Sequence, residues 1–63
     1  MHEEIWRLPY VLATIGMGRS WLYREIANGR FPPPVFLGER AVGWKRSEVE
    51  AWLRTRPRKA RSK

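Results

Sequence analysis

The chain has 63 residues, no cysteine and a formal net charge of +7. This length bounds it to one small domain, and the missing cysteine excludes a disulfide framework and a thiolate metal site. We expect neither a membrane span nor a secretory leader, because no apolar run is long enough and residues 1–4, Met-His-Glu-Glu, are not basic.

The positive charge is concentrated at the carboxyl end. Residues 1–53 hold seven basic and six acidic side chains, whereas residues 54–63 hold six basic and no acidic ones. Residues 56–63 are expected to form a basic tail outside the folded domain. Such a segment favours polyanions through counterion release, although it is also compatible with a solvated terminus that keeps the protein soluble.

The first predicted helix begins at Leu8-Pro9, because proline at the first helical position loses no hydrogen bond. Residues 1–6 are predicted to be a frayed lead-in, from which the large Trp6 side chain packs onto the domain. An apolar stripe at helical spacing runs from Leu8 to Ile15, and Gly16 ends the helix.

A second helix is predicted over residues 19–28, with Gly18 as its N-cap and Gly29 as its left-handed C-terminal cap. The short turn between the two helices indicates a helix-turn-helix, although an ordinary helical hairpin has the same pattern. Leu22 and Ile26 form the inner face of the second helix. Its outer face carries short polar and basic residues that suit the major groove of DNA: Ser20, Arg24, Ala27 and Asn28.

Prolines 32–34 predict a stiff, extended connector, and a ligand for proline-recognising domains is the less favoured alternative. Residues 35–44 then predict a two-stranded antiparallel hairpin with Glu39-Arg40 at its tip. Arg40 could contact a phosphate or a minor groove, or it could be a solvated turn residue.

The third predicted helix begins at Ser47, because Ser47 and Glu50 match a capping box. Its inward face is expected to carry Val49, Trp52 and Leu53, and Pro57 ends it. The predicted fold is therefore mainly α: three helices with a small two-stranded wing.

Nothing in the sequence favours an enzyme. The chain has one histidine, His2, and no aspartate, so no acid–base pair or metal-ligand cluster is predicted. Glu25 lacks a catalytic partner and is interpreted as a surface charge. We therefore expect no catalytic residues, no metal and no cofactor.

Several short motifs occur in one order along residues 6–54 and resemble the AlpA family of phage and mobile-element regulators, which are relatives of excisionases. These motifs are Arg7-Leu8-Pro9, Gly16-Met17-Gly18-Arg19-Ser20, Tyr23-Arg24-Glu25-Ile26, Gly29-Arg30-Phe31-Pro32, Gly43-Trp44 and Ser47-Glu48-Val49-Glu50-Ala51-Trp52. The sequence departs from the family pattern at Gly18, where serine is usual, and at Trp21, where threonine is common.

The resemblance implies a MerR-like winged helix-turn-helix domain over residues 7–55 that binds double-stranded DNA. The second helix would enter the major groove, and the wing, residues 35–44, would contact the flanking minor groove or backbone. The protein would be a transcriptional regulator or an excision (recombination directionality) factor of a prophage, bacterial or phage-encoded, cytoplasmic and nucleoid-associated. Its further partners would be copies of itself on adjacent sites and an integrase or recombinase. Taken by position, the DNA-binding residues would be Arg19, Ser20, Tyr23, Arg24, Asn28, Arg30, Arg40 and Lys45.

A second class of function stays open at this point. Small relatives of excisionases can dock an exposed face on another protein. In that case Trp21 and neighbouring aromatic residues would form an interaction patch.

Overall fold

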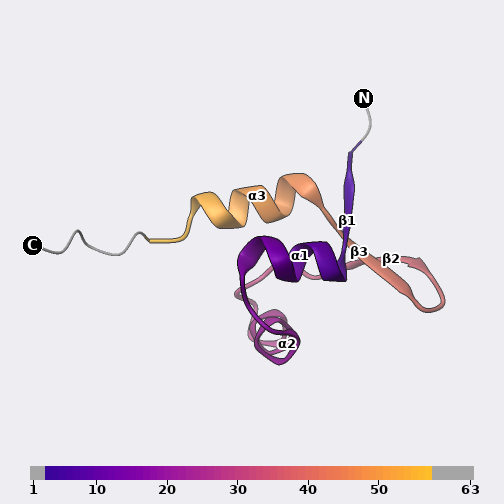
Figure 1. Cartoon of the computed structure of the whole chain (residues 1–63), viewed down its shortest axis with the longest axis horizontal. Helices are drawn as coiled ribbons and strands as arrows, with labels where there is room; N and C mark the ends of the chain where they lie inside the picture. The colour runs from indigo at the N-terminus through magenta and orange to yellow at the C-terminus, as the bar shows by residue number, and fades with distance from the viewer. Residues whose placement is uncertain (1–2, 58–63) are drawn as a thin grey trace, which may run out of the picture.

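The computed structural model describes residues 3–57. Most of the predicted basic tail, residues 58–63, lies outside this range. The elements in chain order are β1 (Ile5–Arg7), α1 (Leu8–Ile15), α2 (Arg19–Ala27), β2 (Val35–Gly38), β3 (Ala41–Lys45) and α3 (Arg46–Arg54). Three helices thus combine with a small antiparallel sheet, which agrees with the predicted winged helix-turn-helix (Figure 1).

The sheet has one strand more than predicted. Its order is β1-β3-β2, and Trp6 of β1 lies opposite Trp44 of β3. The prediction of a frayed lead-in is therefore wrong for Ile5 and Trp6, whereas the prediction that Trp6 packs onto the domain is confirmed. A strand of three residues is too short to show a period-2 pattern, and it forms because β3 offers a free edge.

Gly43 is the residue of β3 that permits this arrangement. A Cβ atom at Gly43 would collide with the side chain of Ile5 and crowd that of Leu37. The two apolar side chains therefore cover the glycine from both neighbouring strands.

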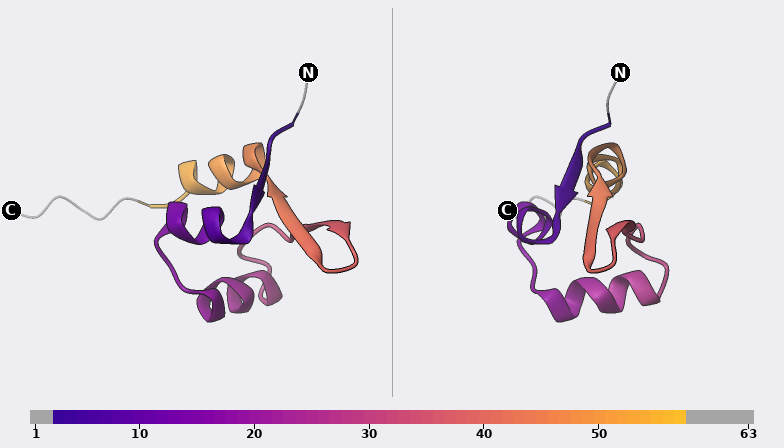
Figure 2. Two further views of the ribbon diagram at one scale, coloured as in Figure 1. Left: turned by 45° about the vertical axis from the view of Figure 1, so that its right-hand side comes forward. Right: turned by 90° about the vertical axis from the view of Figure 1, so that its right-hand side faces the viewer.

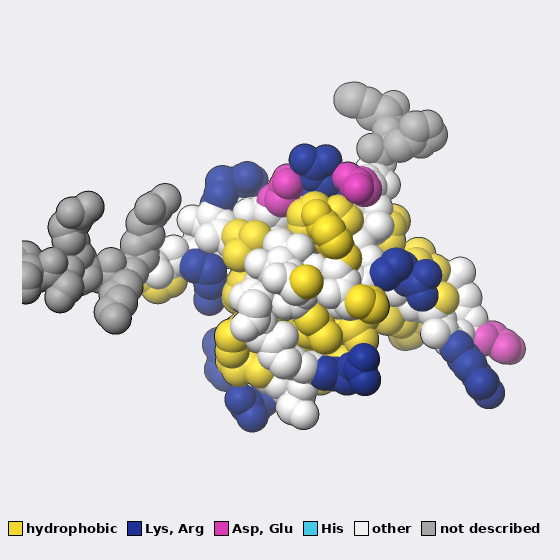
Figure 3. Space-filling model, viewed as in Figure 1, with side chains coloured by type: hydrophobic (Ala, Val, Ile, Leu, Met, Phe, Trp, Pro, Cys, Tyr) yellow, Lys and Arg dark blue, Asp and Glu magenta, His cyan; other side chains and the backbone are white. Residues whose placement is uncertain are grey.

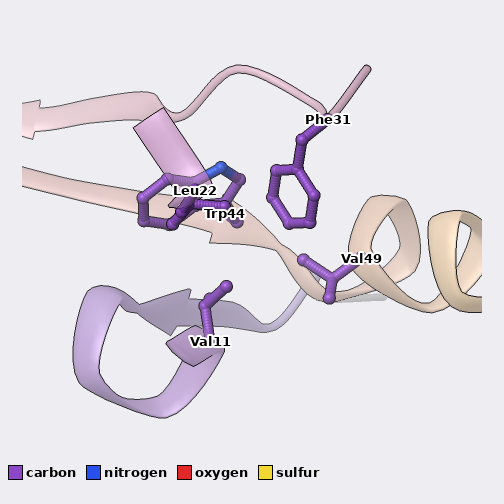
Figure 4. Close-up of a cluster of buried hydrophobic side chains, with 5 residues drawn as sticks. All are labelled: Val11, Leu22, Phe31, Trp44 and Val49. Atoms are coloured by element: carbon purple, nitrogen blue, oxygen red, sulfur yellow. The ribbon is translucent and has the colours of Figure 1, made fainter. Parts of the chain in front are cut away.

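One core joins all three helices to the sheet (Figure 4). The connector between α2 and β2 is fixed to it, because the indole Nε1 of Trp44 donates to the carbonyl of Pro32 at 2.9 Å. The core consists of Val11 from α1, Leu22 from α2, Phe31 from the connector, Trp44 from β3 and Val49 from α3.

The turn between α1 and α2 has the predicted glycine chemistry. Gly16 has a φ of +74°, and its N–H donates to the carbonyl of Leu12 at 2.8 Å, so it caps α1 in the left-handed conformation. Gly18 is the extended N-cap of α2. The two helices cross steeply, since α1 lies across the view of Figure 1 while α2 is seen end-on.

The start of α3 differs from the prediction. The helix begins at Arg46, its N-cap is Lys45, and Ser47 is already a helical residue, so the capping box is wrong. Glu3 supplies the cap instead, because its carboxylate accepts bonds from the backbone N–H and hydroxyl of Ser47. Leu53 was expected to face inward, but its side chain is exposed, since α3 buries a narrower face that is centred on Val49.

None of the helices within residues 3–57 has the length and apolar character needed to cross a membrane.

Candidate nucleic-acid interface

The outer surface of α2 is open to solvent along its length. Leu22 on the inner side is completely buried, and Ile26 packs against the same core. In the right-hand view of Figure 2, α2 lies along the lower edge of the molecule and no other element covers its outer side. The predicted recognition-helix residues are all exposed: Arg19, Ser20, Tyr23, Arg24 and Asn28.

The N-terminus of α2 carries no side-chain cap. Gly18 has no side chain that could accept a hydrogen bond from the first turn. The N–H of Leu22 donates to the Gly18 carbonyl at 3.1 Å and begins the intrahelical bonding. The preceding N–H groups of the first turn are thus without an intrahelical acceptor, as at any helix start. Helix N-termini with free N–H groups bind anions such as phosphate readily.

Arg30 is held in a bidentate ion pair at the other end of α2. Its Nε and Nη2 donate to the two carboxylate oxygens of Glu25 at 2.8 and 3.0 Å, and its backbone N–H donates to the Glu25 carbonyl at 2.8 Å. The hydrogen bond from Arg30 lowers the pKa of Glu25 below its usual range. Arg30 is therefore partly neutralised, unlike the arginines on the outer face of α2.

Trp52 of α3 fixes this end of α2 to the rest of the domain. Its indole Nε1 donates to the carbonyl of Arg30 at 2.7 Å, and its ring meets that of Trp21 edge-on with centroids 6.2 Å apart. The guanidinium of Arg56 lies 4.4 Å from the centre of the same ring. Trp21 is therefore half-buried against α3, and the chain beyond α3 departs next to α2.

The hairpin formed by β2 and β3 projects to one side of α2 (Figures 1 and 2). Arg40 is exposed in the turn between its strands. Lys45 is also exposed, but it lies at the opposite end of β3, near Glu3, whose pKa is lowered chiefly by the hydrogen bonds from Ser47 and to a smaller extent by the charge of Lys45. The structure thus places Arg40 on the wing and does not bring Lys45 to it.

Sequence reasoning missed one cation beside the wing. Arg7 ends β1, and its Nε donates to the carbonyl of Val42 in β3 at 3.0 Å. Only the pairing of β1 with β3 brings Arg7 there, so no local pattern could have indicated it.

The charges are segregated over the domain. Carboxylates gather at the junction of β1 and α3, where the guanidinium of Arg46 bonds to Glu4 at 3.0 Å and to Glu50 at 2.9 Å. Figure 3 shows this mixed cluster at the top edge and basic side chains along the lower edge. Glu25 is the one acidic residue of α2, and its side chain is only 12% exposed beneath Arg30. The outer face of α2 is therefore basic.

Within residues 3–57 no group of histidine, cysteine, aspartate or glutamate side chains could hold a metal ion.

Comparisons with known proteins give one consistent result. The model of the family described as "Prophage CP4-57 regulatory protein (AlpA)" matches residues 4–57. The chain is 45% identical over 51 residues to the uncharacterized protein ORF88 of Enterobacteria phage P4, which covers 81% of this chain and 58% of that protein. It is 34% identical over 59 residues to the DNA-binding transcriptional activator AlpA of Escherichia coli K12, with 84% of each chain covered. No solved structure matches.

Proposed function

Because this chain belongs to the AlpA family of prophage regulatory proteins, we propose that it is a sequence-specific DNA-binding transcriptional regulator. The exposed, basic outer face of α2 is the observation that supports this proposal most directly. A relative of which 84% is covered is named as a DNA-binding transcriptional activator. The chain spans 58% of the length of the phage P4 relative, so the activity and the partners of the whole protein are proposals as well.

In the proposed complex, α2 enters the major groove and the hairpin of β2 and β3 lies on the flanking minor groove or backbone. Arg24 is the proposed base reader, because a guanidinium can donate two hydrogen bonds to guanine O6 and N7. Ser20 and Asn28 are exposed one turn to either side of it and can contact a base or a phosphate. Arg19, Tyr23, Arg40 and the N-terminus of α2 supply phosphate contacts, which position the protein without reading sequence.

Two of the expected cations have a lesser part in this proposal. Arg30 already shares its charge with Glu25, and Lys45 lies at the far end of β3 beside Glu3. Their contribution is therefore limited to general attraction of the duplex.

A selection of bound duplexes from a random-sequence library tests the proposed function. The expected result is enrichment of one short motif, with spacing that reveals whether copies bind side by side. One small domain reads few base pairs, so we expect several copies on adjacent sites. Equal recovery of all sequences, together with salt-insensitive binding to a protein partner, would replace this proposal with the protein-docking alternative.

An excision factor and a transcription activator would both give an enriched motif. The two are separated by testing the enriched site in a promoter reporter and in an integrase-dependent excision reaction. We propose the activator role first, since the relative named for its activity is a transcriptional activator. An effect on excision without an effect on the promoter would reverse that order.

A further inference from the structure

Phe36 on β2 is the most exposed large apolar side chain of the described residues, with 84% of its surface accessible. The next are Tyr10 at 55% and Leu37 at 45%. A single exposed apolar residue is ordinary on a protein surface, so exposure alone indicates no function. The position of Phe36 in the sheet and the charges around it carry the argument.

The strand register places Phe36 on the same face of the sheet as the core. Phe36 lies opposite Val42, and Val42 shares a face with Trp44 because the two are separated by one residue. Trp44 is completely buried beneath the helices on that face. Leu37 points to the other face, where it covers Gly43. The side chain of Phe36 therefore lies on the same face of the sheet as the core, but at a position that the helices do not cover.

The hairpin extends past the helices, as Figure 1 shows, and this explains the exposure of Phe36. Nothing else in the described chain covers the aromatic ring, although its strand partner Val42 packs against the core. The ring is thus presented on the projecting part of the wing, on the face of the sheet that also carries Trp44.

The hairpin turn next to Phe36 carries one acid and one arginine, Glu39 and Arg40. Arg7 bonds to the backbone carbonyl of Val42, but it lies opposite Gly43 and therefore on the other face of the sheet from Phe36. Neither guanidinium is in an ion pair within residues 3–57, and Glu39 is the one acid of the hairpin. In the proposed complex the hairpin lies on the duplex, so an exposed ring near Arg40 can meet the apolar faces of the bases while the guanidinium meets a phosphate.

We propose that Phe36 is a wedge residue that contacts the minor groove of DNA beside the segment read by α2 and partly unstacks one base step there. This inference rests on the proposed function. Minor-groove proteins commonly insert apolar side chains between base steps while arginines hold the adjacent phosphates. Here Phe36 would be the inserted apolar side chain, and Arg40 in the adjacent turn would contact the phosphate.

Phe36→Ala tests the proposal with little risk to the fold, because the side chain is almost fully exposed. We expect an unchanged melting temperature and an affinity for the selected duplex that falls roughly 5- to 100-fold, as for loss of base–aromatic stacking. The slope of affinity against salt concentration should not change, since no charge is removed. Phe36→Leu should retain part of the affinity, because leucine can still insert between base steps but cannot stack on a base. Tyr10→Ala, on α1, is the control and should bind like the unmodified protein.

A fluorescent base analogue at the flanking steps of the duplex gives the direct readout. The unmodified protein should increase the fluorescence of 2-aminopurine at one step, and Phe36→Ala should not. Equal affinity and equal fluorescence for the two proteins would overturn the wedge. Loss of self-association in Phe36→Ala, without a change at any base step, would overturn it in favour of a contact between copies. Absence of selective binding by the unmodified protein would instead refute the proposed function, and the wedge with it.

Discussion

Glu3 caps a helix that begins more than forty residues later in the chain. Its carboxylate accepts a hydrogen bond from the backbone N–H of Ser47 at 3.1 Å and another from the Ser47 hydroxyl at 2.9 Å. The neighbouring backbone is joined as well, since the N–H of Arg46 donates to the carbonyl of Glu4 at 2.9 Å. The beginning of the described chain and the start of α3 therefore form one unit.

This cap predicts a loss of stability in acid. The hydrogen bonds from Ser47 lower the pKa of Glu3 from its ordinary value of 4.5, and the ion pair with Arg30 lowers that of Glu25. A lowered carboxyl pKa stabilises the fold above the ordinary value, and the contribution disappears as pH falls through the folded-state value. The melting temperature should therefore decrease below about pH 4.5.

Glu3→Gln isolates the part of this effect that belongs to the cap. The variant should melt at a lower temperature at neutral pH and should lose less on acidification than the unmodified protein. Glu39→Gln, in the exposed hairpin turn, is the matched control and should follow the unmodified protein. Identical pH profiles for Glu3→Gln and the unmodified protein would show that the cap contributes nothing to stability.

Trp52→Phe tests the attachment of α2 to α3. Phenylalanine keeps an aromatic ring against Trp21 but removes the Nε1 donor to the Arg30 carbonyl. We expect a loss of about 0.5–1.5 kcal/mol in the free energy of unfolding, measured with urea. Trp6→Phe is the control, because the Trp6 indole N–H makes no hydrogen bond within the described residues. An equal loss in both variants would assign the effect to ring size.

Truncation after Thr55 tests the basic tail. It removes five basic residues, since residues 56–63 contain Arg56, Arg58, Lys59, Arg61 and Lys63. Affinity should fall for selected and scrambled duplexes alike, and the salt slope should become shallower, as expected for lost phosphate contacts. Unchanged affinity at low salt would show that these residues do not contact DNA.

The sequence was sufficient for the elements whose signals are local. Pro9 and Gly16 bound α1, and Gly18 begins α2. The C-cap of α2 is Asn28, one residue before the predicted Gly29, which has the expected left-handed conformation. The strands of the hairpin were indicated by their apolar and β-branched residues. The exposed face of α2 also followed from its period, because helical spacing alone decides which residues are turned away from Leu22.

Apart from the exposure of Leu53, the missed features depend on residues that are distant in the chain. Ser47 and Glu50 match a local capping box, but Glu3 caps the helix instead. The pairing of β1 with β3 brings the Glu3 carboxylate to Ser47. The position of Arg7 beside Val42 has the same origin. Trp52 was recognised as apolar, but its bond to the Arg30 carbonyl depends on how α3 meets the connector, and no periodicity encodes that.

Arg24→Ala is the most direct test of the central claim that the outer face of α2 reads sequence. The quantity to measure is the ratio of affinities for the selected duplex and a scrambled duplex, with Arg54→Ala on α3 as a control that removes the same charge. The account predicts that Arg24→Ala loses about 1–3 kcal/mol of discrimination while its affinity for the scrambled duplex falls no more than that of the control. A ratio that survives in Arg24→Ala and falls in Arg54→Ala would contradict the account.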